Sequence, residues 1–252
     1  MQRPLQSMAH STHPIGDAEV RIVRTIPTMP PSWLFETRED AGRLLAEEVM
    51  RMGLSGPALV LAIPRGGVPV GLPVALALSA PLDVIIPRKI PIPWDPEAGL
   101  GAVTAEGTIV LNEELVSLLG LSQEEIERAA QAVQEEIERR TRVYRGRRPP
   151  PEVAGRVVLL SDDGLASGLT MIAAIRSVRR GGPGRVIVAV PAAPRSSLRR
   201  VEPEADDVVC LVEQVRGPFA VASFYRQFPE LTDEEVLRDL GLAQGLSQGS
   251  AV

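Results

Sequence analysis

Five short apolar runs, separated by longer amphipathic stretches, dominate the hydrophobic pattern of the chain. They cover residues 58–63, 82–86, 157–160, 185–190 and 208–212. Largely apolar runs of this length are typical of strands that are buried on both faces, as in parallel sheets. Much of the chain between them repeats apolar residues at helical spacing. The pattern therefore predicts an α/β fold with a mainly parallel five-stranded sheet flanked by helices.

Three helices are predicted most clearly. Residues 37–52 begin with a capping pair, Thr37 and Asp40, and carry their apolar residues on one face. Residues 68–78 form a second helix directly after the first strand. Residues 122–144 begin with the Ser122–Glu125 capping box. The apolar face of this long helix suits either a cover over the core or a contact in a homo-oligomer.

Residues 90–112 are expected to form a lid and a hairpin, and residues 113–150 a helical insertion. The first part, 90–101, is rich in Pro and Gly. These residues disfavour a regular helix or a central strand and favour an irregular lid. A structural Pro-rich connection with Trp94 packed against the core is the alternative. The second part, 102–112, has the sequence AVTAEGTIVLN, which predicts a hairpin that turns at Glu106-Gly107.

The two ends of the chain lack sustained periodicity. Residues 1–32 are expected to be a mobile N-terminal tail, and residues 241–252 a frayed C-terminus. The folded domain is accordingly expected to cover residues 33–240.

Composition narrows the class of protein. The 252 residues are 44% hydrophobic and 23% charged, as in a soluble globular protein. A net charge of −5 argues against a nucleic-acid partner bound through bulk electrostatics. We find neither a signal peptide nor an apolar stretch long enough for a membrane, so we expect a cytoplasmic protein without a membrane partner.

The single cysteine, Cys210, excludes an internal disulfide and is expected to be buried and inert. The only histidines, His10 and His13, lie in the N-terminal tail, which disfavours Ser–His or Cys–His catalysis.

The third apolar run leads into the chemically richest stretch, RVVLLSDDGLASGLT at residues 156–170. Asp162 and Asp163 directly follow the strand, and they suit hydroxyl groups, a Mg²⁺ ion, or both. A loop of small residues with two hydroxyls, Ser167 and Thr170, then opens a helix, which suits a phosphate monoester. The stretch therefore predicts a site for a ribose 5-phosphate. An ordinary strand end with acidic turn residues is the alternative. The stretch itself contains no basic residue next to the two acids, so we expect the acids to contribute little to the stability of the core.

Two other strands also end in cations. The first runs into Arg65-Gly66-Gly67, and the second into Arg88-Lys89, which contains the only lysine of the chain. The carboxyl edge of an open α/β sheet is where such proteins bind ligands, and adjacent cations suit a polyanion. A plain turn with a surface arginine, and a solvated basic turn, are the respective alternatives.

The stretch DDGLASGLT resembles the phosphoribosyl-pyrophosphate (PRPP) motif of the type I phosphoribosyltransferases. In that motif a hydrophobic strand, two acids, a few spacers and Thr/Ser-Gly-x-Thr follow in this order. Gly164 departs from the bulky apolar residue that the family usually has. The resemblance extends over roughly residues 37–236 and is greatest to bacterial and archaeal members whose base is generally unassigned.

The resemblance implies a fold, an activity and a role for each residue above. It implies a type I phosphoribosyltransferase-like fold and a transferase that joins the ribose of PRPP to a nitrogen nucleophile, in nucleotide metabolism. Asp162 and Asp163 would hold the ribose and Mg²⁺, directly or through water. The 5-phosphate would lie on the loop of Ala166, Ser167, Gly168, Leu169 and Thr170. Pyrophosphate would be bound by Arg65, Gly66, Gly67 and Lys89, in a loop that often contains a non-proline cis peptide, and the catalytic cations would be Arg65, Arg88 and Lys89.

Ala166 provides evidence about which base accepts the phosphoribosyl group. In the 6-oxopurine members that the chain resembles, this position usually holds Asp, whereas adenine- and uracil-type members commonly have Ala. The expected acceptor is therefore a nucleobase-like small molecule other than a 6-oxopurine. Phe219, Phe224, Tyr225 and Phe228 could stack a base or could tie down the C-terminal segment. Two rival functions remain. One is a PRPP- or nucleotide-sensing regulator without activity, and the other is a phosphohydrolase or other transferase that uses a phosphoribosyl substrate.

Overall fold

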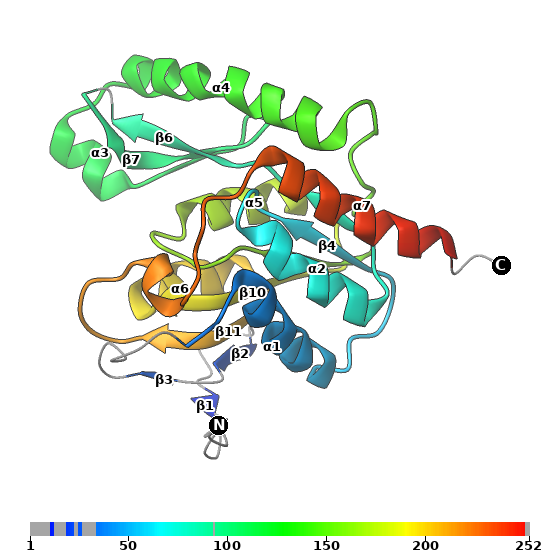
Figure 1. Ribbon diagram of the computed structural model, residues 1–252. Coiled ribbons are helices and arrows are strands. Elements are labelled where there is room, and N and C mark those ends of the chain that lie inside the picture. Colours follow the sequence, from blue (N-terminus) through cyan, green and yellow to red (C-terminus); the bar gives the residue numbers. More distant parts are fainter. Residues whose placement is uncertain (1–10, 13–18, 23–24, 27–33, 93, 250–252) are drawn as a thin grey trace.

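The main sheet contains the five predicted strands, all parallel. The structure is a computed structural model that describes residues 11–12, 19–22, 25–26, 34–92 and 94–249. The strands lie in the order β11-β10-β9-β4-β5. Their bounds are Ala58–Ala62 for β4, Leu82–Val84 for β5, Val157–Ser161 for β9, Arg185–Pro194 for β10 and Asp207–Gln214 for β11. The predicted sheet is confirmed, with β9 between β4 and β10 (Figure 1).

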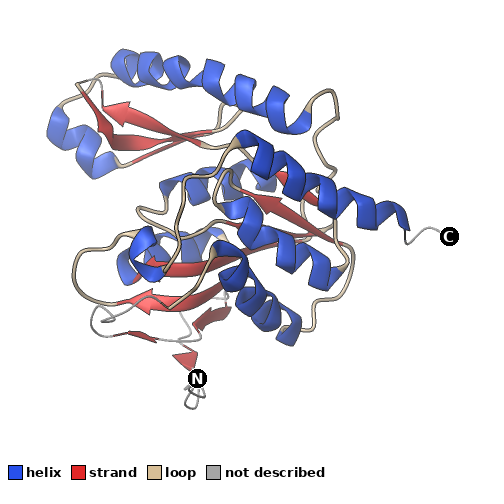
Figure 2. Ribbon diagram, viewed as in Figure 1, coloured by secondary structure: helices blue, strands red, loops and turns tan. Residues whose placement is uncertain are grey.

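Helices cover both faces of this sheet (Figure 2). Successive strand residues point to opposite faces, so each apolar strand supplies two separate cores. Helices α1 (Arg38–Arg51), α2 (Gly67–Leu78) and α7 (Asp233–Gly249) pack on one face. Helices α5 (Leu169–Arg179) and α6 (Arg195–Val201) pack on the other. Two short 3₁₀ helices, Glu202–Glu204 and Val221–Phe224, lie in the connections. No helix in the described part of the chain has the length and hydropathy needed to cross a bilayer.

The segment expected to be an irregular lid is instead regular β-structure. Strands β6 (Arg88–Ile92), β7 (Asp95–Val103) and β8 (Ile109–Leu111) form an antiparallel sheet in which β7 is the central strand. The prolines are tolerated because the β6–β7 pairing shifts register at Pro91. Pro96 precedes the part of β7 that pairs with β8. We call residues 88–145 the hood, because this sheet and its helices lie to one side of the main sheet (Figure 1).

Two helices complete the hood, α3 (Glu113–Leu119) and α4 (Gln123–Arg145). The Ser122–Glu125 capping box that starts α4 is confirmed. The buried side chains of α4 are Ile126, Ala130, Ile137 and Tyr144. Three of them, Ala130, Ile137 and Tyr144, belong to the core on the α1 side of the sheet, so α4 acts as a cover.

The ends of the chain differ from the expected tail and frayed terminus. Strands β2 (Glu19–Ile22) and β3 (Thr25–Ile26) pair with the outer edge of β11, and β1 (Ser11–Thr12) pairs with β2. The remainder of the expected tail lies outside the described residues. At the other end, α7 continues to Gly249, nine residues beyond the expected boundary at 240. A capping box of Thr232 and Glu235 starts this helix, and Val236, Leu240 and Ala243 bury one side of it.

Candidate active site

The acidic turn lies at the centre of the carboxyl edge of the sheet. Ser161 at the end of β9 pairs with Ala62 of β4 and Ala189 of β10, so Asp162 and Asp163 emerge between two neighbouring strands. Burial and the adjacent Asp163 carboxylate raise the pKa of Asp162 well above its usual range. The peptide nitrogen of Asp163 donates to the Asp162 carboxylate at 2.8 Å.

Contrary to expectation, the acid pair has a basic neighbour. Arg38, the first residue of α1, donates from Nε to Oδ2 of Asp163 at 2.8 Å. Its guanidinium lies 3.6 Å from the centre of the Phe228 ring, and only 8% of Arg38 is exposed. Asp163 is therefore an ion-pair partner inside the fold, whereas Asp162 has no such partner among the described residues.

The predicted phosphate loop, residues 166–170, follows the acidic turn. Gly168, the N-cap of α5, has φ 81°, a conformation that favours glycine. A cavity of about 420 Å³ opens beside the loop and is lined by Lys89, Gly99, Gly101, Asp162, Gly164, Ala166, Ser167, Leu169 and Thr170. We call it the phosphate cavity. Helix α5 starts here, so its N-terminal partial charge favours an anion.

The glycine that departs from the family pattern has a packing reason. A Cβ on Gly164 would lie 2.9 Å from both methyl groups of Val221 and 3.2 Å from the carbonyl oxygen of Ala192. Val221 belongs to the connection after β11 and occupies this space instead. Gly164 therefore allows the C-terminal segment to pack closely on the acidic turn.

The loop after β4 packs directly against the acidic turn. A Cβ on Gly66 would lie 1.9 Å from Oδ2 of Asp163. The Pro64–Arg65 peptide bond is cis, as the resemblance implies. Arg65 itself contacts the C-terminal segment: one terminal nitrogen lies 2.5 Å from the Leu231 carbonyl oxygen and 3.3 Å from a Glu230 carboxylate oxygen.

A second cavity, of about 500 Å³, lies on the other side of this loop. Four arginines (Arg38, Arg65, Arg88 and Arg140) line it, together with Pro64, Gly66 and residues 228–231. We call it the arginine cleft. Burial, followed by the nearby Arg140, lowers the pKa of Arg88. Lys89 lines the phosphate cavity rather than this cleft, so the structure separates two adjacent predicted catalytic cations.

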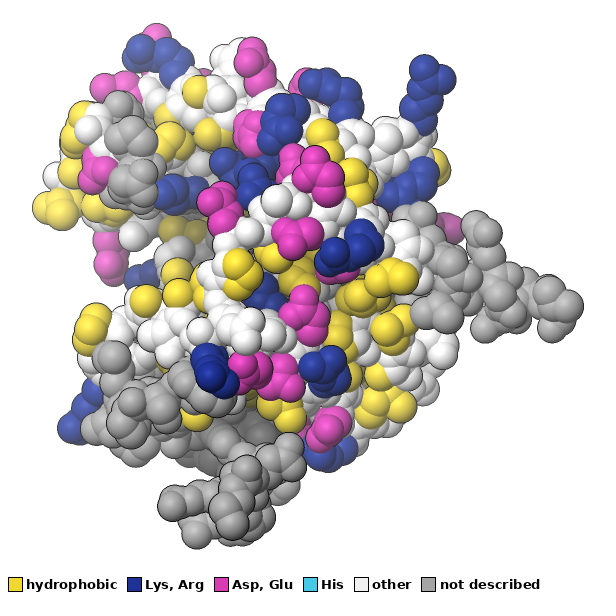
Figure 3. Space-filling view, in the orientation of Figure 1, with side chains coloured by type: hydrophobic (Ala, Val, Ile, Leu, Met, Phe, Trp, Pro, Cys, Tyr) yellow, Lys and Arg dark blue, Asp and Glu magenta, His cyan; other side chains and the backbone are white. Residues whose placement is uncertain are grey.

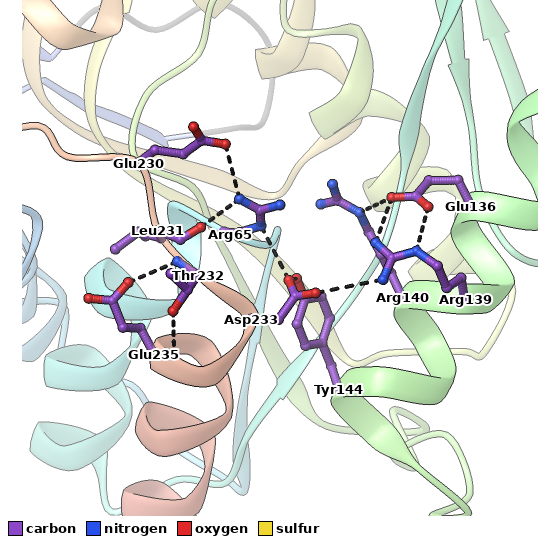
Figure 4. A network of polar contacts seen from close by, with 10 residues as sticks. All are labelled: Arg65, Glu136, Arg139, Arg140, Tyr144, Glu230, Leu231, Thr232, Asp233 and Glu235. Atoms are coloured by element: carbon purple, nitrogen blue, oxygen red, sulfur yellow. Dashed lines mark hydrogen bonds and ion pairs between the residues drawn. The ribbon is translucent and has the colours of Figure 1, made fainter.

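A polar network connects Arg65 to the hood (Figure 4). Asp233 at the start of α7 lies 3.3 Å from Nε of Arg65 and 3.6 Å from a terminal nitrogen of Arg139. The hydroxyl of Tyr144 donates to the same carboxylate. This hydrogen bond and the cations lower the pKa of Asp233.

Replacement of Tyr144 by Phe should lower the free energy of unfolding by about 1.5–2 kcal/mol, because a hydrogen bond to a charged acceptor is lost. The pKa of Asp233 is lowered in the folded state, so its contribution is present above its unfolded pKa, about 3.9. That contribution is lost as the pH falls through the folded value. The difference between variant and wild type in urea unfolding should therefore shrink in acid. Equal stability at neutral pH would contradict the role of this contact.

Sequence reasoning missed four residues of this region: Arg38, Arg140, Tyr144 and Asp233. Arg140 lies in a stretch rich in Glu and Arg that has the pattern of a solvated helix face. Its partner Glu136, four residues earlier, is a visible signal, but this spacing also occurs on exposed helices. The missed residues come close together because of the way in which the hood and α7 pack near the loop after β4.

The C-terminal aromatics pack on one another. The rings of Phe35 and Tyr225 lie 5.4 Å apart, and those of Tyr225 and Phe228 5.0 Å apart. Phe224 and Tyr225 are buried. The Tyr225 hydroxyl donates to the Asp163 carbonyl oxygen at 2.6 Å. Of the two predicted roles, tying down the C-terminal segment is the one that these contacts support.

Cys210 is fully buried, and burial raises the pKa of its thiol to about 12. The expectation of an inert cysteine is confirmed. Among the described residues, no group of three or more His, Cys, Asp or Glu side chains could hold a metal ion. A metal at the acidic turn would thus need further ligands from the substrate or from water, a set that suits Mg²⁺.

Comparison with known proteins identifies the family. The model of the phosphoribosyl transferase domain matches residues 36–228. A protein of Mycobacterium tuberculosis strain H37Rv, whose name assigns it provisionally to the phosphoribosyl transferases, is 39% identical over 211 residues. That match covers 83% of this chain but 47% of the relative, so the chain spans about half of the relative's length. The crystal structure of TT1426 from Thermus thermophilus matches with a TM-score of 0.68 at 41% identity, over 82% of this chain and 97% of that one. Matches of this extent establish that the chain belongs to the phosphoribosyl transferase domain family.

Proposed function

We propose that the protein transfers the 5-phosphoribosyl group of PRPP to a nitrogen nucleophile and releases pyrophosphate. One observation carries the proposal: two cavities suited to anions flank the acidic turn. The phosphate cavity borders Asp162, and the arginine cleft borders Gly66 and Arg38, which both contact Asp163. PRPP has the matching order of groups, with a monophosphate at one end, a diol in the middle and a diphosphate at the other end.

Each end of the substrate then meets a different part of the chain. The 5-phosphate lies at the start of α5, where backbone N–H groups and the hydroxyls of Ser167 and Thr170 can donate to it. Asp162 accepts hydrogen bonds from the ribose hydroxyls, and the side chain of Asp163 remains paired with Arg38. The pyrophosphate lies against the amides of Gly66 and Gly67 and the side chains of Arg65 and Arg88.

The chemistry needs charge stabilisation more than proton transfer. The bond from C1 of the ribose to the pyrophosphate oxygen breaks, the bond from C1 to the acceptor nitrogen forms, and the electron pair leaves with pyrophosphate. The sugar passes through an oxocarbenium-like state, and arginines fixed near the departing oxygens favour the developing charge. Mg²⁺, when bound at Asp162 and the substrate, would neutralise part of that charge.

A pyrophosphate-release assay tests the function. Purified protein, PRPP and Mg²⁺ are incubated with and without each member of a nucleobase panel. The proposal expects release only when an acceptor is added, and loss of release in Asp162→Asn. PRPP binding without turnover for any acceptor would favour a sensor, and release without an acceptor would favour a hydrolase.

The acceptor is expected not to be hypoxanthine or guanine. Ala166 lines the phosphate cavity and offers no carboxylate to take or share the N7 proton of a 6-oxopurine. Steady-state assays with both bases should give kcat/KM below about 10⁴ M⁻¹s⁻¹, the lower end of ordinary enzymes. A higher value would contradict the inference from Ala166, whereas turnover of another base would leave the transferase proposal standing.

A further inference from the structure

Helix α4 of the hood extends one arginine into the arginine cleft. Arg140 lines the cleft together with Arg65 and Arg88, and its side chain is only 11% exposed. Its Nε donates to a Glu136 oxygen at 2.7 Å. Arg139 also donates to Glu136, at 2.7 and 3.0 Å. The two arginines hold the pKa of Glu136 at about 2, so this carboxylate stays ionised and fixes Arg140 in place.

The cations around the cleft are not fully compensated. Arg38 pairs with Asp163, Arg65 with Glu230 and Asp233, and Arg139 and Arg140 share Glu136. Within the part of the chain that the structure describes, Nε of Arg88 is buried without a hydrogen-bond partner. A buried donor without a partner, beside other cations, favours a bound anion.

The face of the molecule seen in Figure 3 includes the boundary between the hood and the rest of the protein. Basic and acidic side chains crowd together where the hood meets the rest of the molecule (Figure 3). The close-up shows Arg65 from the loop after β4, and Arg139 and Arg140 from α4, converging on one region (Figure 4). Lys89, the other cation of the β6 start, lines the phosphate cavity instead. The cleft therefore depends on a helix for which the sequence pattern predicts only a cover over the core or a contact in a homo-oligomer.

We propose that Arg140 of α4, together with Arg88, binds the terminal phosphate of the pyrophosphate group, so that the hood completes this side of the active site. This inference rests on the proposed function. Guanidinium groups match phosphate oxygens with paired donors, and two of them from different elements can hold one phosphate from two sides. The anion supplies the partner that Nε of Arg88 lacks. It also joins α4 to the loop after β4, so ligand binding strengthens the contact between the hood and the main sheet.

Calorimetry with two probes tests the inference. The probes are inorganic pyrophosphate with Mg²⁺ and ribose 5-phosphate, and the variants are Arg140→Gln and Arg88→Gln. Arg142→Gln is the matched control, because Arg142 lies on the same helix, pairs with a carboxylate four residues earlier at 3.7 Å, and is 70% exposed. We expect both test variants to bind pyrophosphate at least ~10-fold more weakly and ribose 5-phosphate within ~2-fold of wild type. The control should bind both probes as wild type does.

Thermal unfolding separates binding from folding. Arg88→Gln removes a half-buried cation whose buried Nε lacks a partner, so its Tm should equal or exceed that of wild type while its pyrophosphate affinity falls. The inference is overturned if Arg140→Gln binds pyrophosphate as wild type does, or if it loses both probes equally together with a lower Tm. If the wild-type protein binds pyrophosphate through Arg140 but binds neither PRPP nor ribose 5-phosphate, the anion site is supported and the proposed function fails.

Discussion

Asp163→Asn is expected to lower the free energy of unfolding by about 2–3 kcal/mol, because it leaves a largely buried arginine without its charged partner. Arg38 has its guanidinium between Asp163 and the Phe228 ring. It also donates to the Pro229 carbonyl oxygen at 2.9 Å. Loss of the ion pair should therefore also loosen the C-terminal segment around residues 228–229.

Asp162→Asn, in contrast, is not expected to lower the free energy of unfolding. Burial beside Asp163 disfavours its charged form, which is the form that dominates in the unfolded chain at neutral pH. Asparagine carries no charge and removes that penalty, so stability should be unchanged or higher. Binding of PRPP with Mg²⁺ should nevertheless weaken at least ~10-fold, about 1.4 kcal/mol, because the proposed ligand for the ribose and metal is lost.

Urea unfolding in the presence of a chelator, followed by calorimetry with PRPP and Mg²⁺, measures both effects. The two variants are controls for each other, since they differ by one position and remove the same charge. A destabilised Asp162→Asn, or an Asp163→Asn as stable as wild type, would mean that the two acids do not divide their roles in this way.

Gly67→Ala is expected to destabilise the protein by about 2–3 kcal/mol through overpacking. Its Cβ would lie 2.5 Å from the Ser161 carbonyl oxygen and 3.0 Å from the Asp162 Cα. Both are backbone atoms. The Ser161 oxygen already accepts from the Ile63 peptide nitrogen at 2.9 Å, so it cannot retreat without disturbing the contact between β4 and β9. The displaced acidic turn should also bind PRPP more weakly.

Gly241→Ala in α7 is the matched control. Beyond the adjacent residues and the nearby backbone of α7 itself, no heavy atom lies within 4 Å of the Cβ that it would add, and the position is helical. The same substitution should raise the free energy of unfolding here, by about 0.5–1 kcal/mol, because alanine reduces the conformational freedom of the unfolded chain. Similar effects of the two substitutions in urea unfolding would argue against the close contact at Gly67.

The predicted elements that the structure confirms are specified by residues that lie close together in the sequence. The five strands and α1 are encoded by short apolar runs and by caps such as Thr37, whose hydroxyl accepts from the Asp40 amide at 3.2 Å. The prediction that residues 90–101 lack regular structure was wrong for a reason that is not local. Proline is excluded from a strand only where its missing N–H is needed, and that depends on which neighbour pairs at that point. Pro91 lies at a shift of register, which the sequence alone does not reveal.

The features of the candidate site also divide into those that depend on neighbouring residues in the sequence and those that depend on contacts between distant segments. A buried strand that leads into an acid pair and a loop of small residues could be predicted from the sequence, because these groups are consecutive and their spacing is set by the backbone. The ion pair of Asp163 with Arg38, the place of Asp162 in the phosphate cavity, and the separation of Lys89 and Arg88 into different cavities became visible only in the folded chain. Adjacent residues on a strand point in opposite directions, and ion pairs form between residues that lie 125 positions apart in the chain. The proposed role of Arg140 likewise depends on the packing of the hood, a contact between distant segments that no local pattern encodes.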